Sequence, residues 1–217
     1  MNLATAPRFL VVLDADSTLI RDEVIELLAD AAGSRELVAD LTERAMRGEF
    51  DFAQSLRERV LTLAGLPESV FTEVGRRIRP TEGVHELIAG IHAGGGVVGV
   101  VSGGFHELLD PLAADLGVDH LRANRLEVEA GRLTGRVLGP IIDAKAKAVA
   151  LCEWAAVDHI ALSQTVAVGD GANDLLMMNA AGLAVAFNAK PRVQREADLI
   201  IDHCNLSQVL PLLGLRG

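Results

Sequence analysis

Short apolar runs alternate with longer amphipathic segments along this chain. The runs have the length of strands and are rich in Val, Leu, Ile and Ala; they cover residues 9–13, 97–101, 165–168, 183–187 and 198–201. A continuous apolar run of this length is typical of a parallel strand that is buried on both faces. The segments between the runs have apolar side chains at helical spacing. This alternation predicts an α/β fold, in which right-handed crossovers connect the strands of a parallel sheet.

A long stretch after the first predicted strand lacks strand character. From residue 21 to residue 79, apolar side chains recur at the spacing of amphipathic helices, as at Phe52, Leu56 and Val60. Strand character returns only at residue 97. The pattern predicts a small helical cap domain that is inserted into the core. The predicted boundaries are 21–79 for the cap domain, and 1–20 together with 80–217 for the core domain.

Residues 125–137 show a different pattern, in which polar and apolar side chains alternate around Ala130 and Gly131. Alternation around a glycine-containing turn predicts a β-hairpin. Residues 144–156 return to helical spacing. The whole pattern predicts a Rossmann-like, three-layer α/β core with an inserted helical cap and a β-hairpin.

Polar loops follow three of the predicted strands. Their sequences are Asp14-Ala15-Asp16-Ser17-Thr18, Ser102-Gly103-Gly104 and Gly169-Asp170-Gly171-Ala172-Asn173-Asp174. Because ligands of open α/β sheets bind beyond the carboxyl ends of the strands, we expect the three loops to meet at one crevice. Crowded carboxylates repel one another unless a cation or a shared proton intervenes. The third loop therefore predicts a metal site that suits Mg²⁺, although its residues are also common in turns.

Asp14 and Asp16 form a second acidic feature. Two residues apart in a continued strand, both could lie on one face. Paired carboxylates can serve as nucleophile and as general acid or base when their environments differ. The alternative is a helix N-cap cluster, which could apply in part to Ser17 and Thr18.

Composition and charge exclude several classes of partner. The chain has 217 residues, of which 50% are hydrophobic, and a net charge of -10 argues against nucleic acid or an anionic membrane as partner. No apolar run approaches the roughly 20 residues that span a bilayer, and the first residues lack the pattern of a secretory signal. Cys152 and Cys204 lack metal-ligand spacing, so we expect reduced thiols and a cytoplasmic location.

These motifs, taken together, resemble those of the haloacid dehalogenase superfamily. The resemblance rests on Asp14-x-Asp16-Ser17-Thr18, Ser102-Gly103-Gly104, Lys147 and Gly169-Asp170-Gly171-x-Asn173-Asp174. It extends over nearly the whole chain, and it is greatest for the members that hydrolyse O-phospho-L-serine. Further matches are Glu23, Met46, Phe52, Arg59 and residues 123–126. Ala15 departs from the family pattern, which usually has an aromatic residue there.

The resemblance implies a Mg²⁺-dependent phosphatase that releases L-serine and phosphate, the last step of serine biosynthesis, through an aspartyl-phosphate intermediate. Asp14 would be the nucleophile. Asp16 would protonate the departing serine oxygen and later activate water. The metal ion would be bound by the carboxylates of Asp14 and Asp170 and by the backbone carbonyl of Asp16. Asp174 would orient metal-bound waters or Lys147.

The resemblance also implies a set of phosphate or substrate contacts. They involve Ser102, the amide of Gly103, Lys147 and Asn173. Lys145 and Lys147 both begin the predicted helix 144–156, and the spacing to Leu151 places Lys147 on the side of the sheet.

Glu23 and Arg59 are expected to determine the substrate. Arg59 lies three residues after Leu56 and so borders the apolar stripe of its helix, whereas charged helix residues are usually solvated. We therefore expect Arg59 to bind a carboxylate and Glu23 to bind an ammonium group. Phe52 would close the site against water, although core packing explains Phe52 equally well.

Two other functions are compatible with parts of this pattern. A related phosphatase or phosphotransferase could act on another small phosphomonoester, such as phosphohomoserine. A signalling receiver could accept a phosphoryl group on aspartate without being an enzyme, but the predicted cap would cover the face that its donor protein needs. The sequence leaves open whether the protein is a monomer or a homodimer.

Overall fold

A mixed, mostly parallel sheet forms the centre of the computed structural model, which describes residues 8–46 and 49–215. The sheet order in this part of the chain is β4-β3-β2-β1-β5-β6-β7. All neighbouring strands are parallel except β3 and β4, which are antiparallel. The strands are β1 (Leu10–Leu13), β2 (Val97–Phe105), β3 (His120–Glu129), β4 (Arg132–Leu138), β5 (Thr165–Gly169), β6 (Leu183–Phe187) and β7 (Leu199–Ile201).

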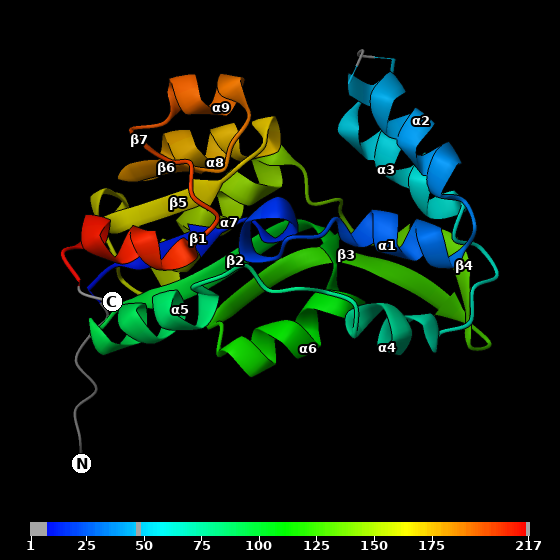
Figure 1. Ribbon diagram of the computed structural model, residues 1–217, viewed down its shortest axis with the longest axis horizontal. Coiled ribbons are helices and arrows are strands. Elements are labelled where there is room, and N and C mark those ends of the chain that lie inside the picture. Colours follow the sequence, from blue (N-terminus) through cyan, green and yellow to red (C-terminus); the bar gives the residue numbers. More distant parts are fainter. Residues whose placement is uncertain (1–7, 47–48, 216–217) are drawn as a thin grey trace.

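Helices cover both faces of the sheet, as the sequence predicts (Figure 1). One face is covered by α5 (Val84–Ala93), α6 (His106–Leu116) and a 3₁₀ helix, Leu206–Leu213. The other is covered by α7 (Ala144–Val157), α8 (Leu175–Ala180) and α9 (Pro191–Glu196). Alternate residues of β1 separate accordingly, because successive side chains of a strand point to opposite faces. Val11 and Leu13 pack in the first layer, and Leu10 and Val12 in the second.

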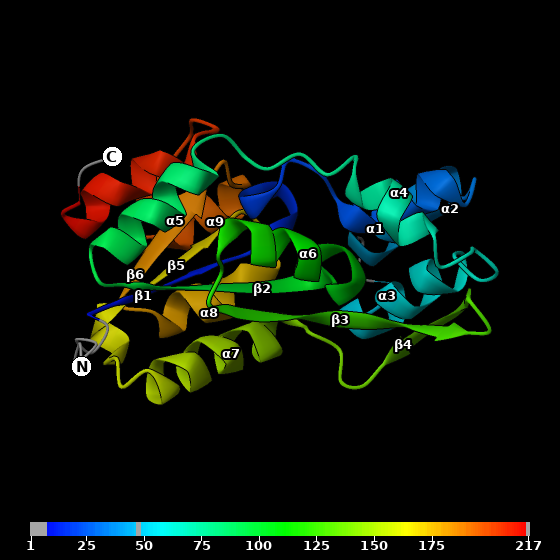
Figure 2. The ribbon, with the colours of Figure 1, turned by 90° about the horizontal axis from the view of Figure 1, so that it is seen from below.

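Four helices lie together beyond the carboxyl end of β1: α1 (Val24–Ala31), α2 (Arg35–Met46), α3 (Phe52–Leu61) and α4 (Val70–Gly75). The tip of the β3–β4 hairpin reaches the same end of the molecule (Figure 2). Leu133 of β4 accepts a hydrogen bond from the amide of Gly65 at 2.8 Å and donates one to the carbonyl of Leu66 at 2.9 Å. The helical segment and the hairpin are therefore joined, which alternation along the sequence does not indicate.

β3 is longer than the sequence predicts. Its first part pairs in parallel with β2, as between Val100 and Leu121, and only its second part forms the expected antiparallel hairpin with β4. The sequence indicates only the second part, because the first contains polar residues such as Arg122 and Asn124. None of the helices in the described part of the chain has the length and apolar character needed to cross a bilayer.

Candidate active site

Asp14 lies directly after β1, between the neighbouring strands β2 and β5. Its backbone amide donates to the carbonyl of Val168 at 3.0 Å, which continues the pairing with β5. The side chain is almost fully buried. Its Oδ1 accepts a hydrogen bond from the amide of Ala15 at 2.6 Å, and its Oδ2 lies 2.7 Å from Nζ of Lys147. Both carboxylate oxygens are therefore held in place by the fold.

The chain turns immediately after Asp14, so the expected continuation of the strand to Asp16 is wrong. Residues Ala15–Leu19 form a helical turn that is distorted at Asp16 (ψ 134°) and Ser17 (φ 58°). Ser17 and Thr18 do not cap a helix either. The Ser17 hydroxyl donates to Oε1 of Glu23 at 2.7 Å, and the Thr18 hydroxyl donates to Oδ1 of Asp170 at 3.3 Å. The turn thus positions acidic side chains from two other segments.

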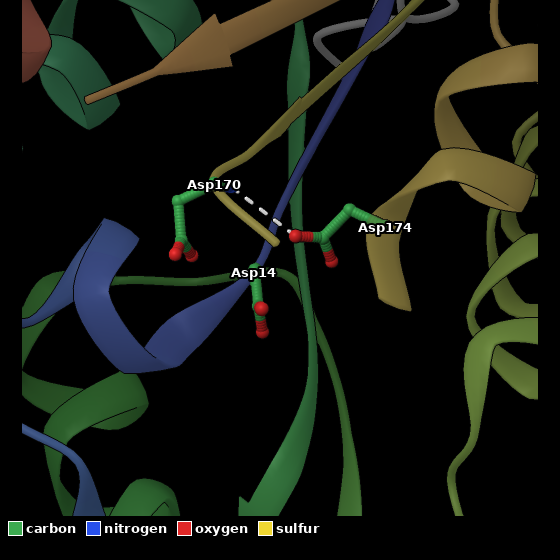
Figure 3. Close-up of side chains that lie close together, drawn as sticks. All are labelled: Asp14, Asp170 and Asp174. Carbon is green, nitrogen blue, oxygen red and sulfur yellow. Dashed lines mark hydrogen bonds between the residues drawn. The ribbon is translucent and has the colours of Figure 1, made fainter. Parts of the chain in front are cut away.

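The loop after β5 is organised by the fully buried carboxylate of Asp174 (Figure 3). Oδ2 of Asp174 accepts hydrogen bonds from the amides of Asp170 at 3.2 Å and Gly171 at 3.0 Å. Its Oδ1 accepts one from Lys147 Nζ at 2.7 Å. A Cβ at Gly169 would lie 2.5 Å from Cγ of Asp174. The glycine at 169 therefore makes room for the Asp174 carboxylate.

Three carboxylates meet at the end of β1 and β5. Single oxygen atoms of Asp14, Asp170 and Asp174 lie within 4.8 Å of one another. Burial, reinforced by the charge of Asp174, raises the pKa of Asp14 well above its usual range and that of Asp170 to about 6. Among the described residues, the Lys147 ammonium group is the cation paired with these carboxylates, and it contacts only Asp14 and Asp174, so the cluster has excess negative charge. Oxygen ligands with excess negative charge fit a hard divalent cation.

Asp16 occupies a different environment from Asp14. Its Oδ1 is buried and has no hydrogen-bond partner among the described residues. Burial raises the pKa of Asp16 well above its usual range, and the charges of Glu23 and Asp14 raise it further. A carboxyl group with this combination binds a proton readily, and Asp16 lines the cavity described next. The geometry suits an acid that acts on a bound molecule.

A cavity of about 140 Å³ opens between the three loops and the helices α1 and α3. It is lined by eight of the eleven residues that the sequence singles out: Asp14, Asp16, Glu23, Phe52, Arg59, Gly103, Asp170 and Asn173. The other three, Ser102, Lys147 and Asp174, are buried behind this wall. The structure thus brings together residues that are up to 159 positions apart in the sequence. The side chain of Met46 lies outside the described part of the structure.

Ser102 contacts the backbone of its own loop. Its hydroxyl oxygen accepts a hydrogen bond from the amide of Gly104 at 2.8 Å, and the residue is fully buried. Lys147 is buried between Asp14 and Asp174, whereas Lys145 is exposed. This agrees with the spacing to Leu151, which places Lys147 on the side of the sheet. Ser102 and Lys147 therefore support the loop and the carboxylates from behind.

Arg59 is half-buried where α3 borders the cavity, whereas its neighbours Arg57 and Glu58 are exposed. Its Nε donates to the carbonyl of Ser55 at 3.2 Å. Burial lowers the pKa of Arg59, although the charges of Glu23 and Asp16 oppose this shift. Within the described residues, Arg59 forms no ion pair. Its guanidinium is available for an anion in the cavity.

Two further residues belong to the site although the sequence assigned neither of them a role. Asn124 is buried; its Nδ2 donates to the carbonyl of Gly103 at 2.8 Å, and its Oδ1 accepts from the amide of Ile142 at 2.9 Å. Lys190 lines the cavity beside Asp170. The strand rule that identified the other loops would have found Lys190, because residues 188–190 follow the predicted strand 183–187. No local pattern indicates the role of Asn124.

Known proteins resemble this chain in sequence and in fold. A family model described as haloacid dehalogenase-like hydrolase matches residues 11–179. A phosphoserine phosphatase of Streptococcus thermophilus is 50% identical over 208 residues, which cover 96% of this chain and 97% of that relative. A phosphoserine phosphatase of Streptomyces coelicolor is 54% identical over 206 residues, which cover 95% of this chain but only 50% of that relative.

A solved structure described as a phospho-aspartyl intermediate analogue of phosphoserine phosphatase has the same fold. It matches with a TM-score of 0.89 and 42% identity, over 95% of this chain and 99% of that one.

Proposed function

Because the chain belongs to the haloacid dehalogenase-like hydrolase family, we propose that it hydrolyses O-phospho-L-serine to L-serine and phosphate. One observation carries the proposal. A small cavity has an aspartate pair on its core wall and the unpaired guanidinium of Arg59 with the carboxylate of Glu23 on its cap wall. Relatives of this chain with 50% identity or more are phosphoserine phosphatases. The reaction would be the last step of serine biosynthesis in the cytoplasm.

In the first step of the proposed reaction, a carboxylate oxygen of Asp14 attacks phosphorus while the bond from phosphorus to the serine oxygen breaks. The product on the enzyme is an aspartyl-phosphate. Asp16 gives its proton to the departing serine oxygen, which its raised pKa and its free Oδ1 allow. Lys147 and the Ala15 amide hold the attacking carboxylate in place.

In the second step, water attacks the phosphorus of the aspartyl-phosphate. Asp16, now ionised, takes a proton from this water while the bond between phosphorus and Asp14 breaks. Phosphate leaves, and both carboxyl groups return to their initial protonation states. The same carboxyl group thus acts first as an acid toward the serine oxygen and then as a base toward the attacking water.

We infer that Mg²⁺ is the cofactor, bound by the carboxylates of Asp14 and Asp170 and the backbone carbonyl of Asp16. When bound, a divalent cation offsets the crowded carboxylates and the charge on the phosphoryl oxygens. Asp174 would position the site from behind, since both of its oxygens are already occupied by Lys147 and by amides. The amide of Gly103 and the side chain of Asn173 would contact the phosphate.

The serine part of the substrate would lie against the cap wall. Arg59 would bind the substrate carboxylate, and Glu23, which the Ser17 hydroxyl orients, would bind its ammonium group. Phe52 would exclude water above Gly103, since a Cβ at Gly103 would lie only 3.1 Å from Phe52 Cζ. We propose that residues 21–79 form a cap domain, which supplies these three side chains to the core domain.

A substrate panel tests the proposal. Phosphate release is measured with Mg²⁺ on L-phosphoserine, phosphothreonine, phosphohomoserine and an aryl phosphate. We expect the highest kcat/KM for L-phosphoserine. Similar values for all four substrates would remove the specific assignment and leave a general phosphatase, and a higher value for phosphohomoserine would reassign the substrate. Release from none of them would contradict the proposed activity.

A further inference from the structure

The carboxyl end of a fourth strand contributes to the cavity. β6 lies next to β5 in parallel register, with Val168 opposite Val185 and Gly169 opposite Ala186. The residues that follow β6 are therefore carried to the same edge as the loop that contains Asp170. Lys190 lines the cavity there, together with Asp170 and Asn173.

Backbone interactions fix the position of Lys190. Its amide donates to the carbonyl of Asp170 at 3.1 Å. The preceding Ala189 carbonyl accepts from Nε2 of Gln194 at 2.9 Å, and the amide of Asn188 donates to the carbonyl of Ile201 at 2.7 Å. None of these bonds uses the lysine side chain. The fold thus holds this residue against the acidic loop and leaves its ammonium group free for another role.

The distribution of cationic side chains around the cavity indicates a role for this ammonium group. Two cationic side chains line the cavity, and Arg59 is the one on the cap wall. Lys190 is the one on the core wall, where its backbone amide is bonded to the carbonyl of Asp170. Lys147 is occupied by ion pairs with two carboxylates. In the described part of the chain, Lys190 is in no ion pair, so it can bind an anion.

We propose that Lys190 is a phosphate-binding residue, whose ammonium group contacts an outward-facing oxygen of the substrate's phosphoryl group and of the inorganic phosphate product. The proposal rests on the proposed function, because it assumes that the phosphoryl group lies against the core wall. Lys190 is exposed, so solvent and salt screen part of its charge. A charge at the rim of a site affects association and its salt dependence more than it affects the chemical step.

The test compares three variants. Lys190→Gln removes the charge and retains most of the side chain's length, and Lys190→Arg retains the charge. Lys145→Gln is the matched control, because Lys145 is also exposed but lies outside the cavity. Binding of inorganic phosphate to the Mg²⁺-loaded protein is measured by calorimetry at low and high salt, and KM and kcat are measured with L-phosphoserine.

We expect Lys190→Gln to weaken phosphate binding about 2- to 5-fold at low salt and to reduce its salt dependence, as for the loss of one exposed ion pair. KM should rise by a similar factor, with a smaller change in kcat. Lys190→Arg should stay within about 2-fold of the wild type, since charge is the property that matters. Lys145→Gln should bind phosphate as the wild type does.

Unchanged phosphate affinity in Lys190→Gln would overturn the proposal. The proposal would also be overturned by a change in Mg²⁺ affinity, measured without phosphate, that accounts for the whole change in phosphate binding, because Lys190 would then only balance the charge of Asp170. Because phosphate binding is measured without turnover, failure of the Lys190 proposal can be told apart from failure of the proposed function. A wild type that binds phosphate through Lys190 but does not hydrolyse phosphoserine would refute the proposed function alone.

Discussion

The Lys147 side chain illustrates how much one residue contributes to this site. Burial by itself would lower the pKa of its ammonium group, but Asp14 and Asp174 raise that pKa above its ordinary value. Lys147 therefore remains charged in the interior and fixes one oxygen of each carboxylate at 2.7 Å. A single cation does not balance the three carboxylates of the cluster, and the remaining charge favours a bound cation.

Asp14→Asn tests the assignment of the nucleophile. An amide lacks the nucleophilic oxygen of the carboxylate, so we expect kcat for phosphoserine to fall by at least about 10⁴-fold, the scale for loss of a covalent nucleophile. The fold should survive, because an amide has nearly the same shape. Activity and circular dichroism are measured on the same preparation. A folded variant with normal turnover would refute the assignment.

Arg59→Ala tests the recognition of the substrate carboxylate. Loss of one partner of a buried charge pair costs about 2–5 kcal/mol, so kcat/KM for phosphoserine should fall by roughly 30- to 5000-fold. The matched control is Arg57→Ala on the same helix, whose side chain is exposed. An aryl phosphate, which has no carboxylate, should be affected much less. An equal loss for both substrates would place Arg59 at the phosphate instead.

At the scale of elements, the two connections between the α1–α4 segment and the core run side by side. Ile20 pairs with Pro80, and the amide of Arg21 donates to the carbonyl of Arg79 at 2.9 Å. Asp22 strengthens this junction. Its Oδ2 accepts from the backbone amide of Arg79 at 2.8 Å, and its Oδ1 accepts from Nη2 of Arg79 at 2.6 Å. The junction thus fixes where the helical segment leaves and re-enters the core.

The Asp22 carboxylate should make the stability of the protein depend on pH. Burial raises the pKa of Asp22, but the hydrogen bonds from Arg79 outweigh this, and its pKa lies below the usual range. The ionised form is therefore favoured in the folded state. Its contribution is complete above the pKa of the unfolded chain, about 3.9, and is lost as pH falls through the lower folded value.

We expect Asp22→Asn to lower the free energy of unfolding by about 1–3 kcal/mol at pH 7, the scale for hydrogen bonds to a charged group. The difference from the wild type should shrink below about pH 4. Urea unfolding at pH 7, 5 and 3.5 measures it, with Asp40→Asn, an exposed aspartate of α2, as control. A difference that is constant over this pH range would show that the carboxylate charge is not involved.

At the scale of the whole molecule, the site lies where the core meets the helical end of the molecule. The carboxyl ends of β2, β1, β5 and β6 provide the core wall, and α1 and α3 provide the opposite wall. Negative charge accumulates between these two walls, because Asp14, Asp16, Asp170 and Glu23 all line the cavity. A cation that binds there should stabilise the folded state as a whole.

Addition of Mg²⁺ should therefore raise the Tm. A ligand at 100 times its Kd stabilises the folded state by about 2.7 kcal/mol, which for a chain of this size corresponds to roughly 5–10 °C. Chelation should reverse the shift. Asp170→Asn should show a smaller shift, and without metal it should be at least as stable as the wild type, because it removes one repulsive charge. Equal Mg²⁺-induced shifts in both proteins would place the metal site elsewhere.

Much of the fold could be predicted because burial imposes a repeat on the sequence. β1, β5 and β6 are apolar at nearly every position, since both faces of these strands are covered. The first half of β3 has polar residues with tertiary partners, such as Arg122 with Glu153 and Asn124 with Gly103, and so lacks that repeat. The turn at Ala15–Leu19 escaped prediction because the strand pattern gives no sign of where the chain turns or of the contacts that its hydroxyl groups make with Glu23 and Asp170.

The sequence by itself determined the fold class, the acidic loops and the identity of eight residues around the cavity. Five of them follow from local runs and from the position of each loop after its strand, and Glu23, Phe52 and Arg59 follow from the family resemblance and the apolar stripe of a helix. Only the tertiary structure decided which polar atoms meet. It showed that the Lys147 ammonium group lies between the carboxylates of Asp14 and Asp174, and that Asn124 bonds the backbone of Gly103 and Ile142. These facts depend on distances between segments far apart in the chain, and no local pattern encodes such distances.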